Sequence, residues 1–233
     1  MERFEFFFTI YSLLLGLALA ELMLGYANLL RSPKRPAWGW LTPVLGVLIF
    51  LLIITSFLDA WLKLQQIQLN LVGLLTPTLV GVSYFVAAVM AVPRSATDWD
   101  SLDDYFHDRK KWILGLLAAQ LVLTVFVTEL PIHLDTAARV GWQAIHTEWV
   151  IANIVILALH LAPIFTRNYW ANLLSMLGLI AIIFYYYGNF TQSMFEPAPA
   201  HAPAPGAASE TPPGSPPPAP APSGASAGTP PPR

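Results

Sequence analysis

The sequence predicts an all-α, polytopic transmembrane bundle of about six helices, followed by a disordered, Pro/Ala-rich C-terminal tail. Of the 233 residues, 55% are apolar and only 11% are charged, whereas a soluble domain usually carries about 25% charged residues. The apolar residues also gather into six stretches. Each is long enough for a helix to cross about 30 Å of hydrocarbon, which takes about 20 residues.

The six predicted spans cover residues 4–30, 38–62, 71–92, 112–130, 142–165 and 169–189. Backbone groups in hydrocarbon have no water to bond, so each span is expected to be helical. Aromatic side chains lie at the span ends, as is typical of the lipid headgroup region; they are Trp38, Trp40, Trp61, Trp112, Trp142, Trp149, Trp170 and Tyr185 to Tyr187. In the third span, Pro77 is expected to kink or delay the helix.

The first stretch is open to a second interpretation, because residues 6–17 and the small residues after them are similar to a secretory signal and its cleavage site. However, residues 1–5 carry no net positive charge, and the apolar run continues past Glu21 to Leu30. We therefore expect an uncleaved first helix.

The sequence divides into a membrane domain, residues 1–192, and a tail, residues 193–233. The tail is rich in Pro, Ala, Gly and Ser, cannot bury enough apolar surface to offset its chain entropy, and favours extended polyproline segments. It is either a spacer or tether, or a dispensable extension. The net charge of −2, without a basic stretch, argues against nucleic-acid binding. The absence of cysteine excludes disulfides and thiolate chemistry.

The distribution of Lys and Arg predicts the orientation. One side of the membrane receives eight, namely Arg31, Lys34, Arg35, Arg94, Arg109, Lys110, Lys111 and Arg167. The other side receives Arg3, Lys63, Arg139 and the final Arg233. The positive-inside rule places the first group in the cytoplasm. Both termini are then expected on the periplasmic or extracellular side.

The longest cytoplasmic loop, residues 93–111, contains a helix start. Ser101 and Asp104 have the spacing of a capping box, with acids in the first turn, so the fourth helix is expected to begin near Ser101. The acids of this loop are expected to pair with Arg109, Lys110 and Lys111 at helical spacing. A solvated helix entry is favoured over a docking site for a partner protein.

Ionisable groups inside a span are costly and mark candidate sites. In the first helix, Glu21 and Asn28 share one face. Glu21 is either a proton- or cation-binding carboxylate or a neutral glutamate that hydrogen-bonds neighbouring helices. In the fifth span, His146, Asn153 and His160 recur every seven residues. The two histidines lie about 21 Å apart, so they cannot share a metal ion. They are either stations along a polar path or two interfacial histidines, and the second interpretation is favoured.

A second polar cluster is predicted near the outer surface and comprises Asp59, Glu129, His133 and Glu148, with His146 beside them. No pair has a diagnostic metal-ligand spacing. Glu129 and His133 are four residues apart, but Pro131 is expected to break the turn between them. Asp59 is expected to be neutralised by Lys63. No metal or other cofactor is therefore predicted, and a haem held by two histidines is disfavoured because one member of each candidate pair lies outside a span.

The fourth span also carries a polar stripe, Gln120, Thr124 and Thr128. Such side chains either hydrogen-bond neighbouring helices or line a hydrated cavity, and helix packing is the favoured interpretation. The sequence contains no nucleophile–base or metalloprotease motif. An enzyme is accordingly the least favoured class.

Two spaced patterns carry a resemblance: Tyr11, Gly16 and Glu21 in the first helix, and Leu102, Phe106 and Arg109 before the fourth span. On these residues the chain resembles a group of bacterial six-helix membrane proteins of no assigned activity. The resemblance covers the helical body but not the tail. It implies the bacterial inner membrane as the location and says nothing about activity.

Two functions remain open at this point. The first is a small proton- or ion-linked transporter or channel-like protein, in which Glu21, Asn28 and the face with His146, Asn153 and His160 line a polar path through the bundle for a small ion or solute. The second is a non-catalytic scaffold or accessory subunit. Besides the lipid bilayer, the expected partners are a second copy of the chain or another membrane protein.

Overall fold

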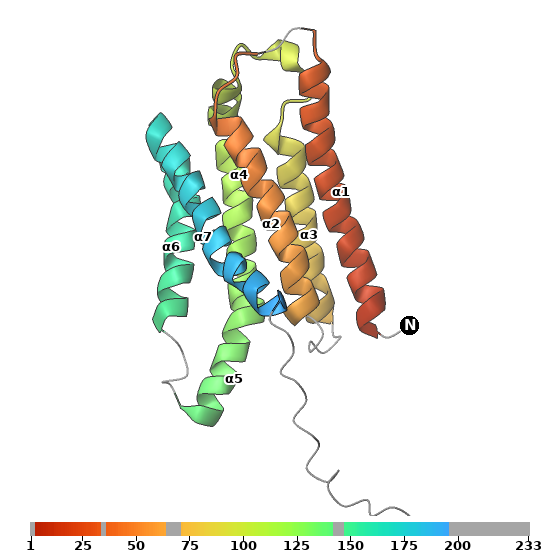
Figure 1. The fold of residues 1–233 in the computed structure, drawn as a ribbon, viewed down its shortest axis with the longest axis vertical. Coiled ribbons are helices and arrows are strands. Elements are labelled where there is room, and N and C mark those ends of the chain that lie inside the picture. The colour runs from red at the N-terminus through yellow and green to blue at the C-terminus, as the bar shows by residue number, and fades with distance from the viewer. Residues whose placement is uncertain (1–2, 34–35, 64–70, 142–146, 196–233) are drawn as a thin grey trace, which may run out of the picture. The chain divides into compact units, whose positions relative to one another are not determined.

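The computed structural model describes residues 3–33, 36–63, 71–141 and 147–195. The helices are α1 (Arg3–Arg31), α2 (Leu41–Lys63), α3 (Leu71–Ala91), the 3-10 turn η2 (Ala96–Asp98), α4 (Leu102–Thr124), the π-helical turn η3 (Val125–Glu129), α5 (Leu130–Val140), α6 (Thr147–Phe165) and α7 (Tyr169–Phe195) (Figure 1). Across these ranges there is no strand, apart from one isolated bridge. The all-α prediction is confirmed. The expected tail beyond Phe195, and His146, lie outside the described residues.

Six helical segments in the described part of the chain are long and apolar enough to cross a membrane. Their outer surfaces carry large apolar side chains: Leu13 is 72% exposed, Trp112 71% and Leu174 64%. An apolar surface of this extent is unstable in water but is the expected boundary with lipid. The chain is therefore a multi-pass integral membrane protein.

Helices α1 and α3 pack against each other, and small residues make their close approach possible. Ala18 on α1 and Ala87 and Ala88 on α3 are buried in the shared core. A Cβ atom added to Gly25 would lie 3.1 Å from Val92, and one added to Gly81 would lie 3.1 Å from Leu14. Small residues bring two backbones close enough for dispersion forces to hold helices together in lipid, where the hydrophobic effect does not.

The loops that follow α1 and α3 join at one end of the bundle, and we call this junction the loop clasp (residues 37–42 and 100–103) (Figure 1). The backbone N–H of Ala37 donates to Asp100 O at 2.8 Å, and that of Leu102 donates to Ala37 O at 3.1 Å. The Thr42 hydroxyl donates to Leu102 O at 2.6 Å. The clasp thereby connects the starts of α2 and α4.

Asp103 has two roles in the loop clasp. As predicted, α4 begins next to Ser101, whose hydroxyl accepts the backbone N–H of Asp103 at 3.1 Å. The Asp103 carboxylate in turn accepts the N–H of Leu41, the first residue of α2, at 3.2 Å. A negative charge there also suits the positive end of the α2 dipole. Gly39 must lack a side chain, because its Cβ would lie 2.0 Å from this carboxylate.

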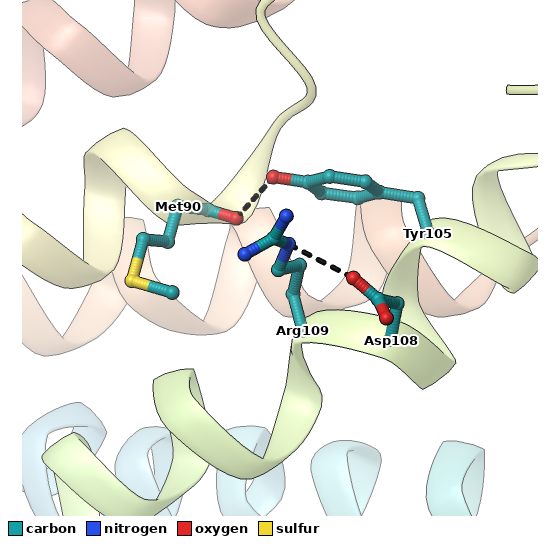
Figure 2. Close-up of polar contacts among 4 residues, drawn as sticks. All are labelled: Met90, Tyr105, Asp108 and Arg109. Atoms are coloured by element: carbon teal, nitrogen blue, oxygen red, sulfur yellow. Dashed lines mark hydrogen bonds and ion pairs between the residues drawn. The ribbon is translucent and has the colours of Figure 1, made fainter. Parts of the chain in front are cut away.

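The ion pairs expected at helical spacing in this region do not form. Asp108 instead pairs with its neighbour Arg109 at 3.0 Å, and the buried Lys110 donates to the carbonyl of Thr166. Figure 2 shows the Asp108–Arg109 pair beside Tyr105, whose hydroxyl donates to Met90 O at 2.7 Å. The first turns of α4 are thus fixed to the end of α3 and to the loop before α7.

Pro77 and Pro163 each lie inside a span without ending it. Pro77 is within α3, which already begins at Leu71, so the helix is not delayed. Pro163 is within α6 and lacks the N–H that would bond to Leu159 O, four residues earlier. The hydroxyl of Ser175 on α7 donates to that carbonyl at 2.7 Å. This bond joins α6 to α7 and satisfies the group that the proline leaves without its helical donor.

The break expected at Pro131 does not occur, and the fourth span is longer than the predicted 112–130. The helix runs from Leu102 to Val140, 39 residues, or about 58 Å at 1.5 Å per residue. It passes Pro131 through the π turn η3, in which the N–H of Leu130 bonds to Val125 O, five residues back. The wider turn accommodates the proline, which can neither donate to Val127 O nor approach it closely.

Candidate functional site

A cavity of about 810 Å³ lies inside the bundle. Its walls come from the later part of α2, the early part of α3, the end of α4 with η3 and the start of α5, the early part of α6 and the later part of α7, with Tyr11 from the early part of α1. All of these segments belong to the half of the bundle away from the loop clasp. The rim residues Ile132, Glu148 and Tyr186 are exposed, so the cavity reaches the protein surface near α5 and the start of α6.

The cavity wall is mostly apolar in area, but many of the residues that line it carry a polar group. Its polar members are Tyr11, Thr55, Ser56, Asp59, Thr76, Tyr84, Gln120, Thr124, Thr128, Glu129, His133, Glu148, Trp149, Asn153, His160, Tyr186 and Tyr187. Aliphatic side chains such as Leu52, Leu117 and Ile156 fill the spaces between them. Buried polar groups in lipid must be satisfied by each other, by water or by a ligand.

The two carboxylates of the inner wall are held by aromatic donors from other helices. Tyr187 on α7 donates its hydroxyl to Asp59 Oδ2 on α2 at 2.8 Å. Trp149 on α6 donates its indole N–H to Glu129 Oε2 at the end of η3, at 3.0 Å. These bonds cross between helices, so they hold the walls of the cavity as well as the carboxylates.

The π turn determines which groups face Trp149. The His133 ring lies 4.2 Å from the Trp149 ring, centroid to centroid, at 40°. The extra residue of a π turn shifts everything after it around the helix axis, and such turns are frequent at functional sites. With the helix unbroken, Glu129 and His133 both contact Trp149 from successive turns. The expected break at Pro131 would have separated them.

His160 is buried in the cavity wall, with 3% of its surface exposed. Its Nδ1 lies 2.9 Å from Ile156 O. A carbonyl oxygen can only accept, so Nδ1 carries a hydrogen and Nε2 is the second ring nitrogen. Nε2 has no hydrogen-bond partner among the described residues. The ring therefore lies within the bundle and not on its outer surface.

The stripe Gln120, Thr124 and Thr128 also belongs to the cavity, although helix packing was the favoured interpretation. The Thr124 hydroxyl is buried and makes no hydrogen bond. A hydroxyl in a helix usually bonds back to a carbonyl one turn earlier, as Thr78 does with Leu74. An unbonded hydroxyl on the wall of a cavity is available to a ligand or to water.

The structure brings some of the predicted site residues together and leaves others apart. Asp59, Glu129, His133 and Glu148 from the predicted outer cluster share the cavity with Asn153 and His160 from the predicted path. The Asn153 amide donates to Trp149 O at 3.0 Å. Glu21 and Asn28 on α1 do not line the cavity; Glu21 is half-buried and Asn28 is exposed.

Sequence reasoning assigned several cavity residues to other roles. Trp149 and Tyr187 were expected at the lipid headgroups, and Tyr84 and Ser56 were not singled out. Tyr11 entered only through a resemblance, yet its hydroxyl lies 2.6 Å from that of Ser56. An aromatic residue at a span end has the same sequence pattern whether it faces lipid or a neighbouring helix. Only the presence of acidic residues within other spans, such as Asp59 and Glu129, could have indicated that Trp149 and Tyr187 face neighbouring helices and not lipid.

The described residues do not form a metal-binding site from side chains alone. Across the described ranges, no three His, Asp or Glu side chains are grouped closely enough to hold a metal ion.

Comparison with protein-family models, with curated proteins and with solved structures found no match to the chain. The functional argument therefore depends on the cavity itself.

Proposed function

We propose that the chain is a small transporter or channel-like protein whose ion or solute enters the cavity between α2, α4, α6 and α7. The observation that carries the proposal is an interior space of about 810 Å³ whose wall, although mostly apolar, includes Asp59, Glu129 and His160. Ligand sites commonly occupy about 300–1,000 Å³. Helix packing alone would be served better by apolar side chains than by Asp59, Glu129 and His160, because polar groups in lipid are costly.

The two ends of the bundle differ in the way that a transport mechanism requires. The cavity reaches the surface at one end, whereas the loop clasp and the buried core residues Phe106, Ile113 and Leu114 fill the other. A solute bound in the cavity would cross only after the helices near the clasp separate. This arrangement corresponds to one state of an alternating-access cycle, with Asp59, Glu129 and His160 on the wall that the solute would contact.

The proposed orientation places the clasp end in the cytoplasm of a bacterial cell and opens the cavity to the periplasm. Arg94, Arg109, Lys111 and Arg167 belong to the clasp end, and cytoplasmic loops of inner-membrane proteins are enriched in Lys and Arg. The cavity would then collect its solute from outside the cytoplasm.

The absence of native cysteine allows a direct test. A membrane-impermeant, charged thiol reagent modifies a cysteine only where water reaches it, since the thiolate is the reactive form. We expect Asn153→Cys to be modified from the periplasmic side and its neighbour Ile154→Cys, 62% exposed toward lipid, to remain unmodified. On α4 the matched pair is Thr124→Cys, expected to react, and Val122→Cys, expected not to.

The opposite result would favour the alternative function. If Asn153→Cys and Thr124→Cys both stay unmodified from either side while the purified protein remains folded, no water-filled cavity exists. The polar groups would then serve helix packing, as in a scaffold or accessory subunit. Recovery of a stoichiometric membrane-protein partner would support that outcome.

A further inference from the structure

Lys110 on α4 is a buried cation without a counter-ion. Only 2% of the residue's surface is exposed. The ammonium donates to the carbonyl oxygen of Thr166, in the loop between α6 and α7, and lies 5.9 Å from the centroid of the Phe106 ring. It forms no ion pair with an acid in the described part of the chain. A buried charge is normally paired, because a carbonyl and a ring replace its hydration only in part.

Two further cations adjoin Lys110. Its bond to the loop before α7 brings Lys110 and Lys111 against Arg167, and the charges of Lys111 and Arg167 both repel the Lys110 ammonium. Lys111 and Arg167 are exposed, and neither forms an ion pair with a described residue. The neighbouring acid Asp108 is paired with Arg109 (Figure 2). We call Lys110, Lys111 and Arg167 the basic cluster. Like charges this close destabilise one another unless an anion joins them.

His107, one turn before Lys110 on α4, gives a separate indication that a polar partner is missing. Its Nδ1 atom is buried and has no hydrogen-bond partner among the described residues. The charges of Lys110 and Arg167 act on its ring together with those of Asp103 and Asp104. The two acids thus offset part of the positive charge beside His107, but not that around Lys110. A buried nitrogen without a bond calls for water or a ligand group nearby.

Tryptophan side chains place the basic cluster at the depth of the lipid headgroups. Trp112 directly follows Lys111 and is 71% exposed, and Trp170 lies three residues after Arg167 and is 65% exposed. Exposed tryptophans of membrane proteins gather at the headgroup region. The cations therefore lie at the level of the lipid phosphates. None of them lines the cavity, so a solute inside the cavity is not the missing anion.

We propose that the basic cluster binds the headgroup phosphate of an anionic phospholipid. The phosphate contacts the exposed Arg167 and Lys111 and offsets the charge of Lys110 beneath them. A guanidinium can hold two phosphate oxygens at once, and an ammonium acts as a point charge. Basic pockets between transmembrane helices bind anionic headgroups in this way. A zwitterionic headgroup is a poorer ligand, because it brings a cation of its own. The site is independent of the proposed function.

Lipid binding to the full chain in neutral detergent tests the proposal. By native mass spectrometry we expect dioleoylphosphatidylglycerol to bind saturably, and dioleoylphosphatidylcholine, which has the same acyl chains, to bind about fivefold more weakly or less, since each cation near an anionic headgroup contributes about that factor. Phosphatidylglycerol should also raise the melting temperature, because a ligand of the folded state stabilises it. Glycerol 3-phosphate, which lacks the acyl chains, should not raise it at the same concentration.

Two double variants with equal loss of charge make the result specific. Lys111→Gln/Arg167→Gln removes the exposed cations of the basic cluster and is expected to weaken phosphatidylglycerol binding about tenfold or more. Arg31→Gln/Arg94→Gln removes two exposed cations from the same end of the bundle but outside the cluster, and is expected to leave the affinity unchanged.

Lys110→Met tests the buried charge itself. It replaces the ammonium by an apolar chain of similar length, and removal of an uncompensated buried charge is often neutral or stabilising. Without anionic lipid we expect a melting temperature no lower than that of the wild type. Phosphatidylglycerol should raise it less than it raises the wild-type value.

The proposal is wrong if phosphatidylcholine binds as tightly as phosphatidylglycerol, or if Lys111→Gln/Arg167→Gln keeps the wild-type affinity. Equal weakening in Arg31→Gln/Arg94→Gln would also overturn it, because the lipid would then respond to the total charge of this end of the bundle. If glycerol 3-phosphate stabilises the chain as much as the lipid does, the cluster is a general anion site and the assignment to a lipid fails. None of these outcomes bears on the cavity, which thiol labelling of Asn153→Cys tests separately.

Discussion

Tyr187 near the end of α7 donates its phenol hydroxyl to the carboxylate of Asp59 near the end of α2, at 2.8 Å. The two residues are 128 positions apart in the chain. Their hydrogen bond joins two helices that both line the cavity. A charged acceptor makes such a bond stronger than one between neutral groups.

Replacement of Tyr187 by Phe tests the stabilising effect of this bond. Because Asp59 would lose a donor while half-buried, we expect the free energy of unfolding to fall by about 1–2 kcal/mol. In a domain of this size that corresponds to about 2–8 °C in melting temperature. The measurement is thermal unfolding in detergent. Tyr186→Phe, an exposed neighbour, is the control, and equal losses in both variants would contradict the prediction.

A double-mutant cycle tests the link between Pro163 and Ser175. Ser175→Ala alone removes the donor to Leu159 O and is expected to cost about 1 kcal/mol. In a Pro163→Ala background the new backbone N–H can bond to the same carbonyl, so the effect of Ser175→Ala should shrink toward zero. Thermal unfolding of the four proteins gives the coupling energy. Strictly additive losses would show that Ser175 does not replace the missing helical donor.

The loop clasp predicts a strong effect of Gly39→Ala. The new Cβ would lie 2.0 Å from the Asp103 carboxylate, so either the loop or the bond from Leu41 must shift. We expect a loss of about 1–3 kcal/mol, the usual range for overpacking. Gly115→Ala on α4 meets no atom within 4 Å and is expected to be neutral or stabilising by up to about 1 kcal/mol. Similar melting temperatures for the two variants would be evidence against the close contact.

Orientation can be measured with two single-cysteine variants at exposed positions. Thr97→Cys lies in the loop between α3 and α4, and Ala138→Cys lies in α5. In intact spheroplasts we expect an impermeant thiol reagent to modify position 138 and not position 97. Inverted membrane vesicles should give the reverse pattern. Modification of position 97 in spheroplasts would overturn the assignment of the clasp to the cytoplasm.

Substitution of Glu21 distinguishes a route through the cavity from the polar path that the sequence predicted along α1. Because Glu21 does not line the cavity, Glu21→Gln is expected to leave modification of Asn153→Cys by the impermeant thiol reagent unchanged. A slower or absent modification would show that a route involving α1 contributes to the site. Thiol labelling of the two single-cysteine proteins, with and without Glu21→Gln, provides the measurement.

The membrane class, the approximate spans and the start of α4 at Ser101 were determined by the sequence alone. Each depends on local properties: the length of an apolar run, the cost of a bare backbone in lipid, and the capping of a helix by the next few residues. These causes act within about one helix. The order of residues along the chain is therefore sufficient to predict them.

The composition of the cavity was decided by tertiary structure. Periodicity showed that Gln120 and His160 each lie on a polar face, but not that the two faces meet, because that depends on how α4, α6 and α7 are rotated and spaced. The π turn at Pro131 is a further case. A local rule predicted a broken helix, while the structure keeps it continuous by adding a residue to one turn. Side chains from distant parts of the chain become one site only through helix packing, which no single segment specifies.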